Sequence, residues 1–497
     1  MYIGHILLDV EVTMRFSGSF TLLLASAALA GCTVGPDYRR PTLAAPTSFM
    51  GAAAVAGRAP ATAVVSAPAP VSASAWWASF GDPVMTDLVA HALEQNLDIA
   101  QAVARVTQAR AGLHAADAAL LPSGTVSGSA AALRLSGETL QGRQLAAFGT
   151  NRNQESYEAD LGASWEIDLF GGLRRDREAA AADYQASQAG VAAARLSVAA
   201  QVADTYIMIR GLQARLAVAT DQVATQQKLV DTIGLQYRKG VAAELQLRQA
   251  EGVLAQVQGT VPTLTIALDG ALNALDVLMG AQPGTYRARL SQPSAIPAPP
   301  AMADIGSPAD LLRRRPDLIV AERRLAASNA RIGAAISEYF PKLSLTGLIG
   351  TAATGPGALF TGAATQAQGV AGLRWRLFDF GRVDAEIKSA RGRNAEALAA
   401  YRLAVLRASE DVENSFSALV NREAQQRMLA GGETSLARAQ QSSMAAYKGG
   451  VVSLIEVLDA DTRLLATRDA LVQARTESAR AAVASFRSLG GGWSGAI

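Results

Sequence analysis

The sequence predicts a mainly α-helical protein with a smaller β component, in which two β-hairpins in each chain supply strands to a membrane β-barrel. Three observations predict this fold. The chain contains a tandem duplication, each half contains segments in which polar and apolar residues alternate, and each half contains a proline-free stretch of 67 residues (238 − 172 + 1). The aromatic content of 5% and the many alanines favour long, closely packed helices over a thick globular core.

The two halves of the chain match at a constant offset. The offset is 210 residues (375 − 165) for Trp165 and Trp375, Phe170 and Phe380, Gly171 and Gly381, Gly280 and Gly490, and the segments YRKGV (237–241) and YKGGV (447–451). Upstream it is 219 residues (338 − 119), where ALLPS at 119–123 matches EYFPK at 338–342. A fixed offset over such a distance indicates a duplicated unit. The extra residues of the first half lie between Pro122 and Trp165.

The duplication predicts a simple domain order. We expect a signal peptide (1–31), a lipidated Ala/Pro tether (32–75), a first repeat (76–291), a Pro-rich linker (292–307), a second repeat (308–490) and a C-terminal tail (491–497). Each repeat is expected to contain an opening helix, a β-hairpin, a long helix and a return helix. In the first repeat these cover roughly 84–120, 123–168, 172–238 and 243–280. In the second they cover roughly 308–338, 341–378, 382–448 and 453–489.

The only cysteine, Cys32, follows a short positive start at Met14-Arg15, a mostly apolar segment and the small residues of LAGC. This is the layout of a secretory signal, and LAGC resembles a bacterial lipobox, whose cysteine takes a lipid and becomes the mature first residue. A buried structural cysteine fits poorly, because the residues that follow are rich in proline and poor in core residues. Asp9 and Glu11 are atypical of a signal peptide, so we expect translation to start at Met14. The stretch 42–75 is expected to be a disordered spacer.

The strand segments combine a polar and an apolar face. Residues 157–168 alternate for twelve positions, and 342–347 and 371–377 alternate in the second half, whereas 123–135 is assigned by repeat symmetry. Each strand is about the length that crosses a bilayer at a tilt. An ordinary sandwich sheet would explain one such strand alone. The polar residues expected to face a barrel lumen are Glu158, Asp160, Glu166, Asp168, Arg374 and Arg376.

The proline-free stretches predict very long helices. One helix of this length would extend roughly 100 Å at about 1.5 Å per residue, and it needs partner helices along its whole length. Apolar residues spaced by four and then three positions provide such contacts. They are Val202, Tyr206 and Ile209 in the first half and Val412, Phe416 and Leu419 in the second. Gly240 and Gly450 are expected to end the long helices in the left-handed conformation.

Beyond the signal we expect no transmembrane helix, because no apolar run of about 18 residues is found. A membrane-spanning part would therefore consist of strands, and four strands cannot close a barrel. Two copies would give eight strands and three would give twelve. The residues alone do not choose between these numbers.

The composition argues against other classes of function. The net charge of +2 gives no field that would attract nucleic acid, and three histidines with one cysteine offer no metal site. We expect no cofactor apart from the covalent lipid on Cys32. GPGALFTG (355–362) lies between two strand segments and is expected to be a hairpin loop rather than a phosphate-binding loop. Without a recognisable catalytic constellation, we expect the protein not to be an enzyme.

Several of these segments together resemble the outer-membrane factor (TolC-like) family, in its NodT-type lipoprotein branch. The segments are CTVGPDYRRP after the lipobox, WWASFGDP (76–83), the long stretch 311–347, and the paired W…FG and Y…GV motifs. The resemblance implies a homotrimer in the outer membrane, with a twelve-stranded barrel and a long α-helical tunnel that crosses the periplasm. It implies a tripartite efflux system with a periplasmic adaptor (membrane fusion protein) and an inner-membrane RND-type pump, or type I secretion.

The family also implies where the working residues lie. Its tunnel closes at the turns furthest from the barrel, so the aperture candidates are Glu456, Asp459 and Tyr447. Three copies of each acid would form negative rings that favour cations. The first-half positions at the same offset are Gln246 and Gln249, which carry no charge. The residues expected to contact the adaptor are Tyr237, Arg238, Gly240, Val241, Gly450 and Val451.

Two simpler interpretations remain open for these residues. Glu456 and Asp459 are alternatively ordinary solvated helix charges, and the glycine segments are alternatively plain helix-capping turns. Two classes of function remain as well: an export channel and a lipid-anchored periplasmic coiled-coil scaffold without a pore. The polar strand face favours the channel.

Overall fold

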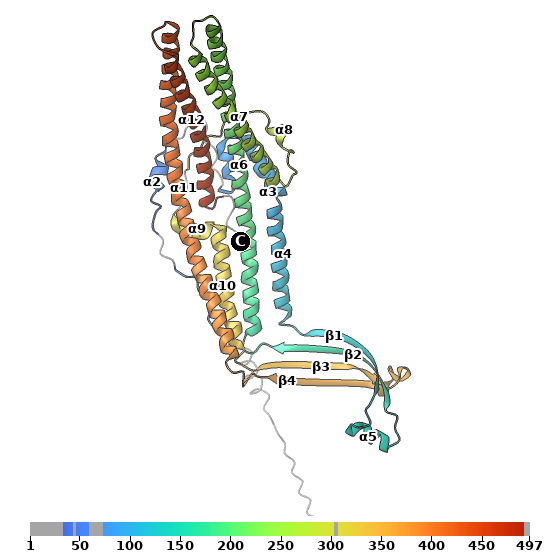
Figure 1. The fold of residues 1–497 in the computed structure, drawn as a ribbon. Helices are drawn as coiled ribbons and strands as arrows, with labels where there is room; N and C mark the ends of the chain where they lie inside the picture. Colours follow the sequence, from blue (N-terminus) through green and yellow to red (C-terminus); the bar gives the residue numbers. More distant parts are fainter. Residues whose placement is uncertain (1–32, 43–45, 59–72, 303–306, 492–497) are drawn as a thin grey trace, which may run out of the picture. The chain divides into compact units, whose positions relative to one another are not determined.

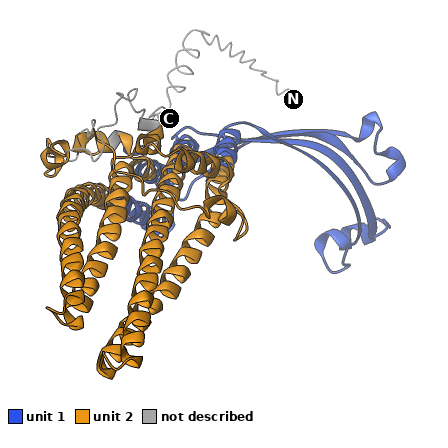
Figure 2. Cartoon of the chain, turned by 90° about the horizontal axis from the view of Figure 1, so that it is seen from above, with its two compact units in different colours: residues 1–39, 110–183, 325–397 blue, residues 40–109, 184–324, 398–497 orange. Residues whose placement is uncertain are grey.

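The computed structural model describes residues 33–42, 46–58, 73–302 and 307–491 (Figure 1). The chain divides into two compact units, which Figure 2 distinguishes by colour. Unit 1 contains the described residues of 33–39, 110–183 and 325–397, and unit 2 contains those of 40–109, 184–324 and 398–491. Each unit therefore takes residues from both repeats.

Unit 1 contains one antiparallel sheet with the strand order β1-β2-β3-β4 (Figure 1). The strands are β1 (Ser123–Arg134), β2 (Asn153–Ile167), β3 (Lys342–Ala353) and β4 (Thr365–Arg374). The short helix α5 (Leu140–Ala147) lies between β1 and β2 and accounts for the longer first hairpin. Two 3-10 turns, Pro356–Ala358 and Gly362–Ala364, connect β3 to β4. The loop around GPGALFTG is therefore part of a hairpin, as predicted.

The strand register sorts the side chains of the sheet onto two faces. Asp160 pairs with Ser127 of β1 and with Gly350 of β3, and Ser344 of β3 pairs with Gly372 of β4. Directly opposed residues share a face, so the polar positions of all four strands lie together. The residues of this polar face include Ser123, Thr125, Ser127, Ser129, Glu158, Asp160, Ser164, Glu166, Ser344, Thr346, Gln366 and Gln368. The opposite face carries Val126, Leu161, Trp165, Leu345, Ile349 and Leu373.

The opening helix of each repeat is broken into two, whereas the sequence predicted one continuous helix. The first consists of α3 (Pro83–Gln95) and α4 (Leu97–Ala118), and the second of α9 (Pro308–Arg314) and α10 (Pro316–Ser337). Asn96 causes the first break, because its side-chain oxygen accepts the backbone N–H groups of Asp98 and Ile99 and so caps α4. The second break lies at Arg315, immediately before a proline that cannot continue the helix.

The long helices and return helices are present in both repeats. They are α6 (Gly172–Arg238), α7 (Glu244–Leu278), α11 (Arg382–Lys448) and α12 (Leu454–Ser488). The residues predicted to lie between helices are fully buried, including Tyr206, whose hydroxyl donates to Asp82 at 2.8 Å, and Phe416. The predicted helix–helix contacts are therefore confirmed. The remaining short helices are α2 (Ala52–Ala56), the 3-10 helix η1 (Ala73–Phe80) and α8 (Arg287–Leu290).

Part of the predicted disordered tether is ordered, which corrects that expectation for residues 46–58. Phe49 is buried and makes an edge-to-face contact with Phe416, at 5.8 Å between ring centroids. The backbone N–H groups of Met50 and Gly51 donate to the carboxylate of Glu413 at 2.7 and 3.0 Å. An aromatic anchor and a bidentate hydrogen bond compensate the entropy of ordering this segment. Cys32 and the predicted signal peptide lie outside the described residues.

One described helix, α7, is by length and composition apolar enough to cross a membrane, so the expectation of no such helix was too strict. The same test is passed by helices that pack within a protein. Asp276, in the last turn of α7, is fully buried, and its carboxylate accepts the backbone N–H groups of Gly284 and Tyr286 at 2.6 and 2.9 Å. These bonds fix the end of α7 within unit 2.

Candidate functional site

Two glycine turns join the long helices to the return helices, and both have the same geometry. Gly240 and Gly450 have φ angles of 72° and 73°, the left-handed region that favours glycine. The N–H of Gly240 donates to Tyr237 and that of Gly450 donates to Tyr447, each at 2.9 Å. Both turns therefore cap the preceding helix, as the sequence predicted.

An apolar cluster joins the two helical hairpins close to these turns. Leu229 and Ile233 of α6 pack with Leu454 and Val457 of α12, and all four are buried. Because the cluster takes residues from both repeats, it holds the two turns together. Several side chains at the turns remain exposed, among them Tyr237, Arg238, Val241 and Val451.

A groove of about 750 Å³ with a mixed polar and apolar lining lies beside this cluster. It is lined by residues of α6, α7, α11 and α12, including Gln236, Gln246, Gln440, Tyr447 and Lys448. The Tyr447 hydroxyl donates to the side-chain oxygen of Gln236 at 3.1 Å, so it links the two repeats. Tyr237, the counterpart of Tyr447, is exposed at the surface instead. The sequence singled out Tyr447 but gave no partner for it.

Glu456 and Asp459, the two acids predicted to form the aperture, lie in the first turns of α12 and are both exposed. Glu456 lies in the first turn of the helix, where a negative charge is stabilised by the helix dipole. Asp459 forms an ion pair with Arg463, at 2.9 Å between Oδ2 and Nε. The sequence analysis missed Arg463. This cation partly neutralises the charge that Asp459 brings to the site.

A third acid, Asp461, lies nearby and is buried with an exposed fraction of 6%. Its Oδ2 accepts a long hydrogen bond from Gln226 Nε2 at 3.4 Å, while the Oε1 of Gln226 is buried without a partner. Burial raises the pKa of Asp461, although hydrogen bonds from Gln440 and Gln226 and the charge of Arg468 oppose the shift. The sequence carried a signal for this residue, because Asp461 continues the spacing of buried residues at Leu454 and Val457.

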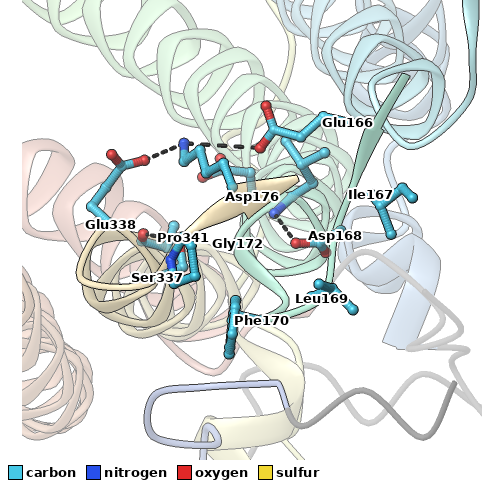
Figure 3. A pocket seen from close by; sticks show the side chains of 13 residues that line it. Glu166, Ile167, Asp168, Leu169, Phe170, Gly172, Asp176, Ser337, Glu338 and Pro341 are labelled. Carbon is cyan, nitrogen blue, oxygen red and sulfur yellow. Dashed lines mark hydrogen bonds and ion pairs between the residues drawn. The ribbon is translucent and has the colours of Figure 1, made fainter. Parts of the chain in front are cut away.

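At the base of the sheet, a small pocket is surrounded by carboxylates (Figure 3). Lys342 forms ion pairs with Glu338 and, at 3.9 Å, with Glu166. Asp168 accepts the backbone N–H groups of Leu173 and Arg174 at 3.2 and 2.9 Å. Asp168 therefore lies beyond β2 and caps α6, which corrects its assignment to the barrel lumen.

Arg376 also lies outside the sheet, because β4 ends at Arg374. Its guanidinium forms ion pairs with Glu338 and Glu386 at 2.9 and 3.3 Å, so its assignment to the lumen is corrected as well. The alternation continued past Arg374 in the sequence, but the ladder between β3 and β4 ends at the pair of Lys342 and Arg374. Asp160 remains on the polar face and accepts a hydrogen bond from Gln366 Nε2 at 2.8 Å.

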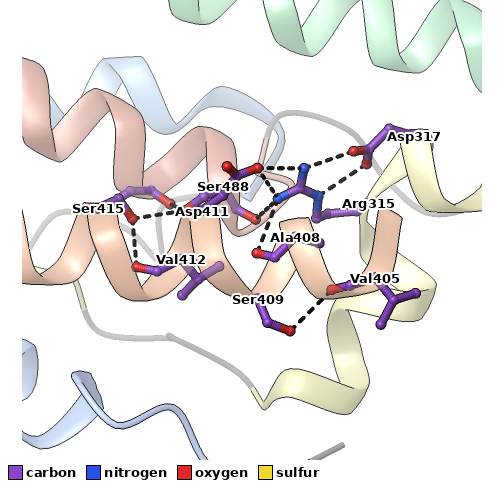
Figure 4. Close-up of polar contacts among 10 residues, drawn as sticks. Arg315, Asp317, Val405, Ala408, Ser409, Asp411, Val412, Ser415 and Ser488 are labelled. Carbon is purple, nitrogen blue, oxygen red and sulfur yellow. Dashed lines mark hydrogen bonds and ion pairs between the residues drawn. The ribbon is translucent and has the colours of Figure 1, made fainter. Parts of the chain in front are cut away.

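Arg315 is the centre of a polar network that the sequence analysis did not single out (Figure 4). Its guanidinium donates to Asp317 and Asp411 at 2.8 and 3.1 Å, and to the backbone oxygen of Ser488 at 3.2 Å. Ser488 is the last residue of α12, so Arg315 caps that helix and joins it to α10 and α11. The segment LLRRRPDLIV thus has a structural role.

A sheet with one polar and one apolar face, together with long helical hairpins that end in glycine-capped turns, defines an outer-membrane channel protein. The chain belongs to the outer membrane efflux protein family, whose profile matches residues 88–281 and 308–491. The resemblance inferred from the sequence is confirmed, and the main function predicted, an outer-membrane efflux channel that extends into the periplasm, is supported over a scaffold without a pore.

Individual relatives match almost the whole chain. Nodulation protein T of Rhizobium leguminosarum bv. trifolii is 29% identical over 97% of this chain and 98% of its own length. The toluene efflux pump outer membrane protein TtgF of Pseudomonas putida is 31% identical over 94% of this chain and 95% of its own length. Among solved structures, the outer-membrane channel OprN has a TM-score of 0.82 at 33% identity, covering 93% of this chain and 100% of OprN. CusC has a TM-score of 0.78 at 26% identity and the same coverages.

Proposed function

We propose that the protein acts as a homotrimer that passively conducts substrates out of the cell and performs no catalytic step. A periplasmic adaptor and an inner-membrane RND-type pump would deliver the substrates. The trimer would combine twelve strands into a barrel and continue it as a helical tunnel across the periplasm. Type I secretion is the second candidate, with a different inner-membrane partner.

The open sheet of unit 1 is the observation that carries the proposal. Its two outer strands, β1 and β4, each have one edge without a partner strand among the residues that the structure describes. An unpaired strand edge in lipid costs several kcal/mol for each backbone group, so neighbouring copies have to complete the sheet. The exposed apolar face, with Val126, Leu161 and Ile349, suits contact with lipid, and the polar face suits a water-filled lumen.

The aperture would lie at the glycine turns. In a trimer, Glu456 and Asp459 would each form a ring of three carboxylates around the axis, which would favour cations and slow anions. Glu158, Asp160, Glu166 and Arg374 would line the barrel lumen.

The adaptor would dock at the same turns. Val241 and Val451 are 77% and 79% exposed, and each follows its glycine directly. An apolar side chain on each of two equivalent turns, next to the exposed Tyr237 and Arg238, provides a small contact surface with a polar rim. Gly240 and Gly450 would hold these side chains in place.

Lipid attachment at Cys32 would anchor the N-terminus beside the sheet. The next residue, Thr33, lies against Gly171 at the start of α6, and the N–H of Val34 donates to the backbone oxygen of Phe170 at 3.1 Å. The described chain therefore begins near the end of β2. That position suits acyl chains inserted into the membrane surface next to the strands.

The choice of cargo would belong to the pump rather than to this channel. Three relatives that are about equally identical to this chain, and that match most of its length, have names that refer to different cargoes: toluene, cations and pyoverdine. A passive conduit would admit all of these classes, because its wall carries small polar side chains rather than a shaped pocket.

Conductance in a planar bilayer tests the proposal. We expect the purified protein to form cation-preferring channels, and we expect Glu456→Ala and Asp459→Ala to weaken the preference. The matched control is Glu251→Ala, an equally charge-changing substitution on α7 that lies outside the predicted ring. The absence of conductance in the wild type and in all variants would contradict a channel, and equal effects of all three substitutions would contradict the aperture.

A further inference from the structure

Phe380 has an unusual conformation and no ring partner in the described part of the chain. Its φ angle is 54°, the one positive φ among described non-glycine residues, and its side chain is fully exposed. Its counterpart in the first repeat is Phe170 (380 − 210), which stacks on Phe340 at 4.6 Å between centroids and 18° between planes. A large apolar side chain that is fully exposed on a backbone of unfavourable conformation indicates a missing contact.

The duplication identifies the missing contact. Phe170 belongs to the first repeat and Phe340 to the second, so their stack is a contact between consecutive repeats. The counterpart of Phe340 in a first repeat is Leu121 (340 − 219), which is 64% exposed. Leu121 precedes β1 and Phe380 follows β4, and these strands form opposite edges of the sheet. Within one chain, Phe380 and Leu121 thus lie at opposite edges of the sheet. The Leu121 that could contact Phe380 therefore has to belong to another copy of the chain.

The contact between the two repeats also predicts how β4 of one copy aligns with β1 of the next copy. Between β2 and β3, the junction of the two repeats, Gly162 pairs with Leu348 and Leu161 pairs with Ile349. The residue of β2 is replaced by its equivalent in the second repeat, 210 positions later, and the residue of β3 by its equivalent in the first repeat, 219 positions earlier. This places Gly372 opposite Ser129 and Ala371 opposite Ala130. In the same way, Trp165 opposite Leu345 becomes Trp375 opposite Val126.

The faces of the sheet support this register independently. Gly372 lies on the polar face through its pairing with Ser344, and Ser129 lies on the polar face through its pairing with Glu158. A slip by one residue would place the polar face of one copy next to the apolar face of the next. The register would also cover Val126, which is 84% exposed in the single chain, with Trp375, which is 51% exposed.

We propose that β4 of one copy pairs with β1 of the next copy in this register, and that Phe380 packs on Leu121 of that copy. The inference rests on the proposed homotrimer and adds the residues that join its members. The contact between copies would repeat the contact between repeats within the chain, and the exposed Phe380 side chain would supply its ring.

Cysteine cross-linking in the full-length protein tests the register, because the chain contains only one native cysteine. The in-register pairs are Ser129→Cys with Gly372→Cys and Ala130→Cys with Ala371→Cys. Adjacent pairs in an antiparallel ladder alternate between wide and narrow spacing, so one of the two has the narrow spacing. The matched controls are shifted by two residues in either direction along β1 and stay on the same face: Ser127→Cys or Ala131→Cys with Gly372→Cys. Single-cysteine variants measure the background from Cys32.

Upon oxidation we expect covalent dimers and trimers from at least one in-register pair, and about tenfold less product from the shifted pairs, which are diagonal neighbours. Equal or greater cross-linking of a shifted pair would overturn the register. Mass measurement in detergent separates this result from failure of the proposed function. A monomer would contradict the homotrimer itself, whereas a trimer without in-register cross-links would contradict only the inference.

Substitution of the aromatic residue tests the second contact. We expect Phe380→Ala and Leu121→Ala each to lower the dissociation temperature of the trimer, and the double variant to lower it no further than the larger single effect. The matched control is Phe378→Ala, because Phe378 is also exposed but its counterpart is Asp168, which makes no ring contact. An equal effect of Phe378→Ala, or additive effects of the two test substitutions, would overturn the contact.

Discussion

The indole Nε1 of Trp165 donates a hydrogen bond to the backbone oxygen of Leu120 at 2.9 Å, and the indole of Trp375 donates to Tyr339 at the same distance. The two tryptophans are 210 residues apart and the two acceptors are 219 apart (339 − 120). The same hydrogen bond is therefore formed at equivalent positions of both repeats. In both repeats this bond joins the end of the second strand to the residues that follow the opening helix.

We expect Trp165→Phe and Trp375→Phe each to lower the free energy of unfolding by about 1 kcal/mol, because each removes one hydrogen bond and keeps most of the ring. Urea unfolding in detergent measures the change. Because the two bonds are separate, the double variant should lose the sum within about 0.5 kcal/mol. A double variant no weaker than either single variant would show that the two bonds do not act independently.

Arg315 should contribute strongly to the stability of unit 2. Its side chain is 11% exposed, and it bonds two carboxylates and the end of α12, so Arg315→Ala should cost about 2 kcal/mol after allowance for the half-exposed partners. Arg315→Lys should recover only part of the loss, since an ammonium lacks the planar fork. The control is Arg143→Ala, whose pair with Glu138 is solvent-exposed and should contribute nothing measurable to urea unfolding. Equal costs for Arg315→Ala and Arg143→Ala would refute the structural role.

Arg175 should hold the segment that follows Cys32. Its guanidinium, 5% exposed, donates to the backbone oxygens of Val34 and Gly35 at 3.1 and 3.2 Å and to Asp37 at 2.8 Å. We expect Arg175→Ala to increase amide hydrogen exchange of residues 34–38 about tenfold, the equivalent of roughly 1.4 kcal/mol. Arg177→Ala is the control, because Arg177 pairs with Asp117 instead. Unchanged exchange in Arg175→Ala would mean that other contacts hold the segment.

Asp461 should make the helical hairpins pH-dependent. Burial raises its pKa in the folded protein, so its contribution to stability is fully present below the unfolded pKa and is lost as the pH rises through the raised pKa. Asp461→Asn should remove this dependence and, near neutral pH, slow hydrogen exchange around Gln226, because the amide can donate to its unpartnered Oε1. Exchange measured from pH 4 to 7.5 should therefore differ between wild type and variant only at the upper end. A constant difference across the range would exclude titration of Asp461 as the cause.

The fold was largely predictable from the sequence because its signals are repeated and local. Proline-free stretches gave the long helices, Gly240 and Gly450 marked their ends, and alternation marked the strands. The errors arose where a tertiary contact overrides a local pattern. Asp168 and Arg376 continue the alternation of their strands, but the first caps α6 and the second pairs with Glu338 and Glu386. The order of residues 46–58 depends on Glu413, far away in the sequence.

The candidate aperture was predictable only in part. Glu456 and Asp459 came from the resemblance to a family, and their positions on α12 agree with a surface role. Arg463 lies four residues after Asp459 on the same helix, so the spacing in the sequence was a signal for this ion pair. Gln226, which bonds Asp461 from another helix, could not be identified from residue types, because buried amide contacts depend on which helix faces meet. Arg463 changes the cation preference that we expect of the candidate aperture, because it pairs with Asp459.

Arg463 should weaken the cation preference of the channel, because it pairs with Asp459 at 2.9 Å and both side chains are exposed. Arg463→Ala should therefore increase the ratio of cation to anion permeability above that of the wild type. Asp459→Asn should lower this ratio, since it leaves a ring of unpaired cations beside Glu456. Reversal potentials in a potassium chloride gradient measure the ratio, and low salt enlarges the differences because screening is weaker. Lys388→Ala, which removes the cation of an exposed pair on α11, is the matched control and should leave the ratio unchanged. If Arg463→Ala lowers the ratio or leaves it unchanged, these residues lie away from the permeation path.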